Sequence, residues 1–328
     1  MMKRPVLALG LLALLPLQAG AHHGVASLGA AGLEGPGAPV ETSASATLPQ
    51  GSLLVFLKLD QADFETFTAA RDDEATTNRF WLYGAGYGIR PWLSVYAIWP
   101  YNVKTMENNA YNTAGFADPN LMAVLGFTWD GGLRRVPANE SLDDLEDWHF
   151  TVYGGASLPL GDSELADADG AIDPGRSLGF GEPSFSAGVT ATKTLGPRNT
   201  FTLELSTIHF NEHVYDDGSA VRFGGEQRVN VAWSLRVLEN PARKFRLDGN
   251  LEANYLALGR DELAGVGEEA TGGRMLYLMP GLRAYSANLS LGLGVKLPSW
   301  TDLNEDDLQQ GAEGKENYRL VLSFSALH

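Results

Sequence analysis

The sequence predicts an all-β fold, a transmembrane antiparallel β-barrel of about 12 strands. Apolar and polar residues alternate along most of the chain from residue 52 onward, and a β-strand sends successive side chains to opposite faces. Short turns alternate with long acidic connections, as periplasmic turns and outer loops do in outer-membrane barrels. The chain also begins with a stretch typical of exported proteins.

Residues 1–21 are predicted to be a cleaved secretory signal peptide. Met1 to Arg4 is basic, residues 5–17 are apolar, and Ala19-Gly20-Ala21 has the small residues of a cleavage site. The apolar part is shorter than the roughly 20 residues of a membrane-spanning helix. An anchor helix is therefore disfavoured, and a membrane-embedded chain has to cross with strands.

Composition limits the partners. Removal of the signal peptide reduces 24 basic residues to 22 against 40 acidic ones, so the formal charge moves from −16 to −18. Nucleic-acid binding is not expected, because it needs a basic surface to neutralise phosphates. There are no cysteines, so no disulfides hold the exported chain. The acidic residues gather in predicted loops at 60–74, 143–147, 164–173, 261–269 and 302–316.

Residues 51–328 are predicted to form the barrel. The hairpin over 228–257 shows the pattern clearly, with Val229, Val231 and Trp233 alternating with charged or small residues. An even strand count returns both ends to the periplasm. The twelve candidate strands are 52–67, 79–90, 92–103, 120–130, 148–160, 184–195, 199–211, 225–238, 244–258, 273–285, 288–298 and 316–325.

The predicted long connections are 68–78, 104–119, 161–183, 212–224, 259–272 and 299–315. Residues 131–147 break the scheme, because they are long where a short turn is due, and 141–145 read as a small capped helix.

Aromatic residues near the strand ends favour a membrane girdle. A soluble β-sandwich, with these rings packed between two sheets, is the alternative. The residues concerned are Trp81, Tyr83, Trp92, Trp99, Tyr101, Trp129, Trp148 and Tyr255.

Three stretches resemble a known family. They are Gly84-Ala85-Gly86-Tyr87-Gly88-Ile89-Arg90-Pro91-Trp92-Leu93-Ser94-Val95, Leu158-Pro159-Leu160-Gly161-Asp162 and Gly179-Phe180-Gly181-Glu182-Pro183-Ser184-Phe185-Ser186. They look like the recurring stretches of bacterial outer-membrane transporter barrels labelled "MetA-pathway of phenol degradation". The resemblance covers most of 50–328 and implies passage of small, often aromatic or hydrophobic, compounds. The chain departs from the usual barrel ending, because Phe324 is not terminal.

A polar, charge-lined lumen is expected from the residues placed on the non-lipid face. Burying many unpaired charges would cost several kcal/mol each, so these side chains are expected to be hydrated or paired across strands. A selectivity lining that attracts anions and a space-filling salt-bridge ladder both remain open. The residues are Glu204, Arg228, Arg236, Arg246, Asp248, Glu252, Arg283, Lys296 and Arg319.

Residues 22–50 are predicted to form a lumenal plug, with a disordered leader as the alternative. Cleavage after Ala21 would leave His22-His23 at the mature N-terminus. A terminal amine and two imidazoles suit copper or zinc, so a metal site is a candidate here, against an inert solvated tail.

Two further motifs are weaker. His209 and His213 evoke a metal site or a barrel hydrolase, but four strand residues span about 13 Å, so a polar strand end is favoured. Asp167, Asp169 and Asp173 resemble part of a calcium loop, although Leu165 and Arg176 stand where such a loop has acidic ligands. A simple Asp/Gly turn is the alternative.

The function expected from these patterns is an outer-membrane channel for small solutes and not an enzyme. Its expected partners are outer-membrane lipid and lipopolysaccharide, a small solute, and the barrel-assembly machinery. A metal-binding protein using His22 and His23, and a hydrolase using His209 or His213, are the alternatives.

Overall fold

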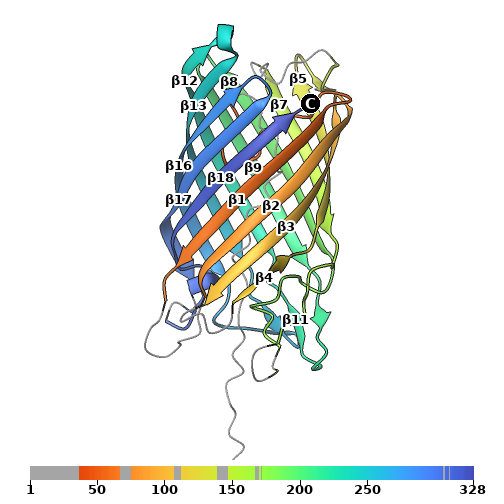
Figure 1. Cartoon of the computed structure of the whole chain (residues 1–328), viewed down its shortest axis with the longest axis vertical. Helices are drawn as coiled ribbons and strands as arrows, with labels where there is room; N and C mark the ends of the chain where they lie inside the picture. Colours follow the sequence, from red (N-terminus) through yellow and green to blue (C-terminus); the bar gives the residue numbers. More distant parts are fainter. Residues whose placement is uncertain are drawn as a thin grey trace, which may run out of the picture.

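A computed structural model describes residues 37–66, 75–106, 112–138, 147–166, 170, 172–305, 307–309 and 311–328. The structure is a barrel of long tilted strands (Figure 1). Its wall strands are β1 (Leu53–Phe64), β2 (Ala75–Arg90), β3 (Leu93–Met106), β5 (Asn120–Trp129), β7 (Trp148–Ser157), β8 (Ser184–Leu195), β9 (Asn199–Phe210), β12 (Glu226–Asn240), β13 (Phe245–Leu258), β16 (Gly273–Ser286), β17 (Leu289–Leu303) and β18 (Glu316–Leu327).

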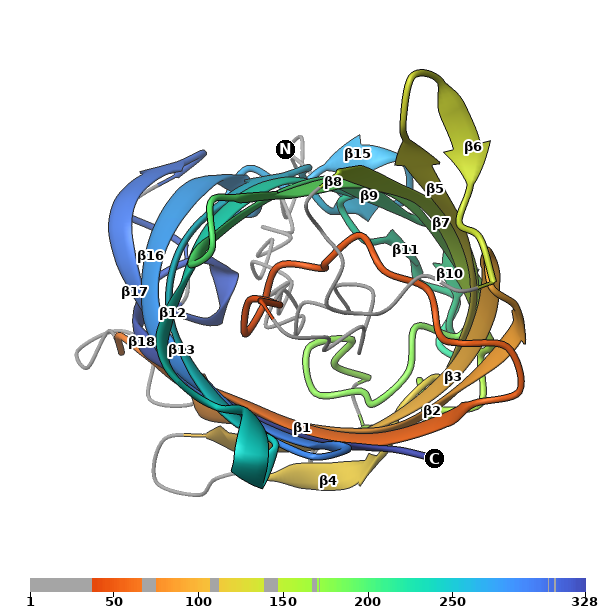
Figure 2. The same ribbon diagram turned by 90° about the horizontal axis from the view of Figure 1, so that it is seen from above.

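The wall is a closed antiparallel ring. Within the described residues it runs β3-β2-β1-β18-β17-β16-β13-β12-β9-β8-β7-β5, and residues 93–98 of β3 pair with 120–125 of β5 to close it. Figure 2 shows the ring along its axis. The predicted fold class and the predicted twelve strands are confirmed, because the alternation of side chains reports each wall strand directly.

Short turns lie at one end of the barrel. Between β12 and β13, the short helix η2 (Pro241–Arg243) follows Asn240, whose side chain accepts a hydrogen bond from the Arg243 amide at 3.2 Å. Lys244 then takes a left-handed φ of 48° to enter β13.

The connections at the other end carry structure that the sequence did not reveal. A second sheet forms from β10 (His213–Val214), β11 (Ala220–Arg222), β14 (Glu262–Leu263) and β15 (Val266–Gly267), where only loops were predicted. β4 (Thr113–Phe116) extends the β3 edge, β6 (Leu133–Arg135) follows β5, and η3 (Gly311–Glu313) precedes β18. Strands of two to four residues are too short for alternation to show. The helix predicted at 141–145 lies outside the described residues.

The outer face of the barrel is apolar. Large hydrophobic side chains stand exposed on the wall strands, among them Leu121, Val152, Leu203, Val231, Leu282 and Leu291. Tyr83, Trp99, Trp129 and Trp148 are exposed on the same face. This is the surface that a membrane barrel presents to lipid, and the closed ring is not a two-layered sandwich. Among the described residues, no helix is long and apolar enough to span a bilayer.

The inner face has two parts. The apolar sector consists of buried side chains on β1, β2, β3, β5 and β7, namely Leu54, Phe56, Phe80, Leu82, Tyr96, Ile98, Met122, Val124 and Tyr153. The charged sector consists of the buried side chains Lys58, Asp60, Glu204, Glu226, Arg228, Arg246, Asp248, Glu252, Arg283, Lys296, Glu316 and Arg319. Buried charged side chains therefore cover only part of the inner face. In the apolar sector both faces of the sheet are apolar, because the inner face packs against other protein groups.

Candidate functional site

Residues 37–48, which we call the N-terminal segment, lie inside the barrel. All of them are buried, and none belongs to a strand. Figure 2 shows this part of the chain inside the ring of strands. Its first residues contact β13 and β16, and its last contact β3. The segment therefore crosses the interior from the charged sector to the apolar sector.

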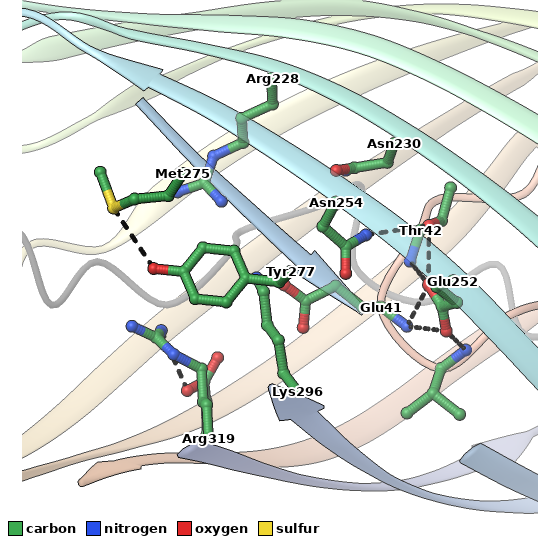
Figure 3. Close-up of polar contacts among 12 residues, drawn as sticks. Glu41, Thr42, Arg228, Asn230, Glu252, Asn254, Met275, Tyr277, Lys296 and Arg319 are labelled. Carbon is green, nitrogen blue, oxygen red and sulfur yellow. Dashed lines mark hydrogen bonds and ion pairs between the residues drawn. The ribbon is translucent and has the colours of Figure 1, made fainter. Parts of the chain in front are cut away.

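One carboxylate holds the start of the segment. Glu252 on β13 accepts hydrogen bonds from the amides of Val40, Glu41 and Thr42 at 2.7, 3.1 and 2.7 Å, and from the Thr42 hydroxyl at 2.7 Å. Figure 3 shows these bonds. Because these bonds converge on the two oxygens of one buried carboxyl group, Glu252 fixes three consecutive residues of the segment.

Two neighbouring wall residues extend this anchor. Asp248 Oδ2 accepts a hydrogen bond from the Gly37 amide at 3.0 Å. Arg283 on β16 donates to the Pro39 carbonyl at 2.8 Å. The backbone of the segment is therefore satisfied by wall side chains of both charge signs.

The Glu41 side chain points the other way, toward two lysines. Its carboxylate lies 2.8 Å from Lys296 Nζ and 3.6 Å from Lys58 Nζ, and its side chain is 1% exposed. Burial acts to raise the pKa of Glu41, but the ammonium groups of Lys296 and Lys58 outweigh it and hold that pKa well below its ordinary value. Glu41 is therefore ionised in this site.

Serines make the next contacts. Glu204 on β9 accepts from the Ser43 amide at 3.1 Å and the Ser43 hydroxyl at 2.7 Å, and also from Tyr153 and Asn230. Ser45 bonds to Thr190 and Thr192 on β8 at 2.6 and 3.0 Å. These contacts are polar, and they lie between the two ends of the segment.

The end of the segment is apolar. Ala46 and Leu48 pack into the apolar sector, and Leu48 is 1% exposed. The Leu48 amide donates to Ser94 Oγ at 2.8 Å, and the Thr47 hydroxyl donates to the Pro91 carbonyl. The segment thus makes polar contacts where it lies against the charged sector and apolar contacts where it lies against the apolar sector.

Eight of the nine predicted lining residues are buried on the inner face. Arg236 is the exception, since it lies half-buried at the short-turn end and pairs with Glu239 at 2.9 Å. We expected these side chains to be hydrated or paired across strands. Arg319 pairs across strands with Asp60 at 3.1 Å, whereas Arg228–Glu226 and Arg246–Asp248 pair within one strand, at 2.5 and 2.7 Å. A strand places residues i and i+2 on one face, which explains these local pairs.

Sequence reasoning missed several charged members of the site, among them Lys58, Asp60, Glu316 and Glu41. Asp60 and Glu316 both pair with the predicted residue Arg319, at 3.1 Å and, through Arg319 Nε, at 3.2 Å. Lys58 and Asp60 alternate with Leu57 and Leu59 on a predicted strand, so the pattern was there to find them. Glu41 had no such signal, because it lies in no strand.

A second feature is a cavity of about 80 Å³ inside the barrel at the end with the long connections. Its lining is mostly apolar and includes Phe80, Leu82, Leu178, Phe180, Ile208 and Phe210. Asn78 and Asn102 also line it, and among the described residues neither Oδ1 atom has a hydrogen-bond partner, although both are buried. Lys104 Nζ donates to the Gly175 carbonyl at 2.9 Å, which holds the β7–β8 connection against the cavity.

The histidines of the hydrolase alternative do not form one site. His209 is exposed on the outer face of β9, whereas His213 on β10 lies 2.9 Å from Glu164. No group of three or more His, Asp or Glu able to hold a metal ion occurs among the described residues.

Four of the other residues predicted to bind a metal ion lie outside the described residues, namely His22, His23, Asp167 and Asp169. Asp173 accepts from the Gly175 amide at 2.7 Å and pairs with Arg176 at 2.9 Å, the arrangement of an Asp turn.

Comparison with known proteins shows the fold. An outer membrane channel from Pseudomonas putida F1 is 14% identical, with 88% of this chain and all of that chain covered and a TM-score of 0.66. The NanC porin is 7% identical, with 84% of this chain and 98% of that chain covered and a TM-score of 0.43. The translocator domain of the autotransporter NalP from Neisseria meningitidis is 10% identical, with 88% of this chain and 90% of that chain covered and a TM-score of 0.43. These two structures are too distant to support an argument. The expected resemblance to outer-membrane transporter barrels is confirmed in the fold. No family model matches the chain, and no curated protein matches it.

Proposed function

We propose that this protein is an outer-membrane channel for small solutes that its own N-terminal segment closes at rest. The observation that carries the proposal is how residues 37–48 are held. They fill the interior, yet almost all their hydrogen bonds run to wall side chains and none extends the sheet. The segment can therefore leave without breaking the strand pairing of the wall.

The size of the ring supports a pathway. An eight-stranded barrel is just wide enough for its own side chains, and barrels of 16–18 strands leave an aqueous channel. A twelve-stranded ring is intermediate, and here the N-terminal segment occupies part of the interior, with the β7–β8 connection and a cavity at the end with the long connections. Departure of the segment would open a lumen lined by the charged sector on one side and the apolar sector on the other.

The outer face supports the location. An apolar belt with exposed aromatic rings suits lipid and lipopolysaccharide, and delivery would use the signal peptide at 1–21 and the barrel-assembly machinery. The domain scheme that goes with this proposal is signal peptide, plug over 22–50 and barrel over 51–328.

The cavity supports a class of solute. Its mostly apolar lining suits a small hydrophobic or aromatic body. The hydrolase alternative has no observation of this kind in its favour among the described residues, where His209 and His213 do not form one site.

Planar-bilayer conductance tests the channel. The mature chain is compared with a variant lacking residues 22–48, both checked for a folded barrel by their heat-dependent mobility on a denaturing gel. We expect rare openings from the full chain and a steady conductance from the deletion. Equal conductance from two folded barrels would contradict the proposal.

A further inference from the structure

We propose that Lys58 and Lys296 form a binding site for the carboxylate of a small amphiphilic acid. In this view the N-terminal segment occupies the site at rest because it imitates such a solute, with Glu41 as the carboxylate and Ala46 and Leu48 as the apolar part. The inference rests on the proposed channel function, since a solute reaches the site only when the segment leaves.

The wall places two cations side by side at this point. Lys296 on β17 lies directly opposite Arg319 on β18 in the strand pairing, and both are buried. Like charges directly opposite each other destabilise a sheet. Wall carboxylates surround Arg319, because Asp60 and Glu316 both pair with it. The ion-pair partner of Lys296 among the described residues is Glu41, which comes from the segment.

The ion pairs give the consequence. Arg228 pairs with Glu226, and Arg319 pairs with Asp60 and Glu316, all of them wall carboxylates. Lys58 and Lys296 both pair with Glu41, which the segment supplies. When the segment leaves, both lysines lose this carboxylate in a partly buried site, so an anion that restores the two contacts is favoured over a neutral molecule of the same shape.

The geometry favours a carboxylate. The carboxylate of Glu41 meets the two lysines through different oxygens, Oε1 with Lys296 and Oε2 with Lys58. The ring of Tyr277 lies 4.7 Å from Lys296 Nζ and limits the site on one side. Figure 3 shows Glu41 among Tyr277, Lys296 and Glu252. A planar anion with two oxygens, such as a carboxylate, can therefore make the same two contacts that Glu41 makes.

The wall beside the two lysines is apolar, and this predicts that the ligand has an apolar body next to its carboxylate. The inner face of β1 reads Leu54, Phe56, Lys58 and Asp60 in order, so the apolar sector begins one inward position from Lys58. Ala46 and Leu48 cover that sector at rest. A solute with its carboxylate at the lysines can therefore lay an apolar body on surface that the segment has uncovered.

Benzoate and benzamide are matched probes, because they share a ring and differ in charge. We would measure their binding to detergent-solubilised full-length protein by calorimetry, in wild type and in Glu41→Gln, which keeps the shape of Glu41 but removes its charge. We expect Glu41→Gln to bind benzoate about tenfold more tightly than benzamide, and wild type to show little binding of either. Equal affinity of the variant for the two probes would overturn the inference.

Added substitutions locate the site. Glu41→Gln combined with Lys296→Met or Lys58→Met should lose the preference for benzoate, and Glu41→Gln with Lys296→Arg should keep it. Glu41→Gln with Lys244→Met is the control, since Lys244 is exposed in a short turn, and it should also keep the preference. A preference that survives both lysine-to-methionine changes would overturn the inference.

The two proposals fail separately. A deletion of residues 22–48 that conducts, together with a Glu41→Gln variant that does not distinguish benzoate from benzamide, removes the carboxylate site and leaves the channel. A deletion that does not conduct removes the channel, and with it the role in transport that the inference assumes.

Discussion

The two sectors of the inner wall hold the same segment by different physics. The apolar sector buries Ala46 and Leu48 against Leu54, Phe56 and other hydrophobic side chains, which stabilises in proportion to the area removed from water. The charged sector uses directed bonds, as between Glu252 and three consecutive amides. Apolar burial tolerates small shifts of position, whereas the directed bonds fix the register of the segment.

The difference between the two sectors shows what the alternation of apolar and polar residues can and cannot predict. Alternation identifies the side of the sheet on which a residue lies, but it does not say what that side faces. In residues 80–83, Phe-Trp-Leu-Tyr, both faces are apolar, and this is the sign that the inner face meets protein and not water.

The largest effect should come from breaking the charged sector itself. Arg319→Met would leave Asp60 and Glu316 buried without their guanidinium partner, at a cost of about 3–5 kcal/mol. The measurement is the free energy of unfolding in urea with detergent or lipid vesicles. Arg222→Met is the matched control, because Arg222 and Glu262 form a solvent-accessible pair in the second sheet, and solvent screening makes the loss of such a pair small. Equal losses from the two variants would contradict the contrast.

The apolar contact should come second. Leu48→Ala removes a buried side chain from the apolar sector and should weaken seating of the segment by about 2–3 kcal/mol, while the barrel keeps its stability. Bilayer conductance should rise accordingly. Leu282→Ala is the control, since Leu282 is 52% exposed on the outer face. A rise in conductance with Leu282→Ala, or none with Leu48→Ala, would argue against this role.

The directed anchor should come third. Glu252→Gln keeps one acceptor oxygen but replaces the other with an amide group that cannot accept from the segment, and it should cost about 1.5–2 kcal/mol of seating, seen as more frequent openings. Glu239→Gln, at the exposed end of β12, should leave openings unchanged. If Glu252→Gln gave the larger effect of the two seating variants, the ranking of apolar over charged contacts would be reversed.

Acidification should give the smallest effect. The pKa of Glu41 is lowered in the seated segment, so its stabilising contribution is complete above its ordinary value of 4.5 and is lost as the pH falls below it. Glu41 faces Lys296, Lys58, Arg319 and Glu252. We expect the openings that depend on Glu41 to increase gradually below pH 4.5. The Glu41→Gln variant should lack that rise; a rise of the same size in this variant would assign it to another group.

Much of the fold could be predicted because its signal is local. The strand predicted at 184–195 coincides with β8, since its period of two needs only neighbouring residues. The inward positions of Arg228, Glu252 and Lys296 follow from the same rule. The second sheet could not be found this way, because β10 and β14 are two residues long and depend on each other's position through β11.

The sequence by itself determined the closed antiparallel wall, its twelve strands and the side on which most residues lie, because these follow from the period of the side chains. Only the tertiary structure decided which groups meet inside. Glu41 and Lys296 are 255 positions apart, and no local pattern connects them. Their contact exists because the ring, in which β17 follows β18 and β1, surrounds the N-terminal segment with the wall.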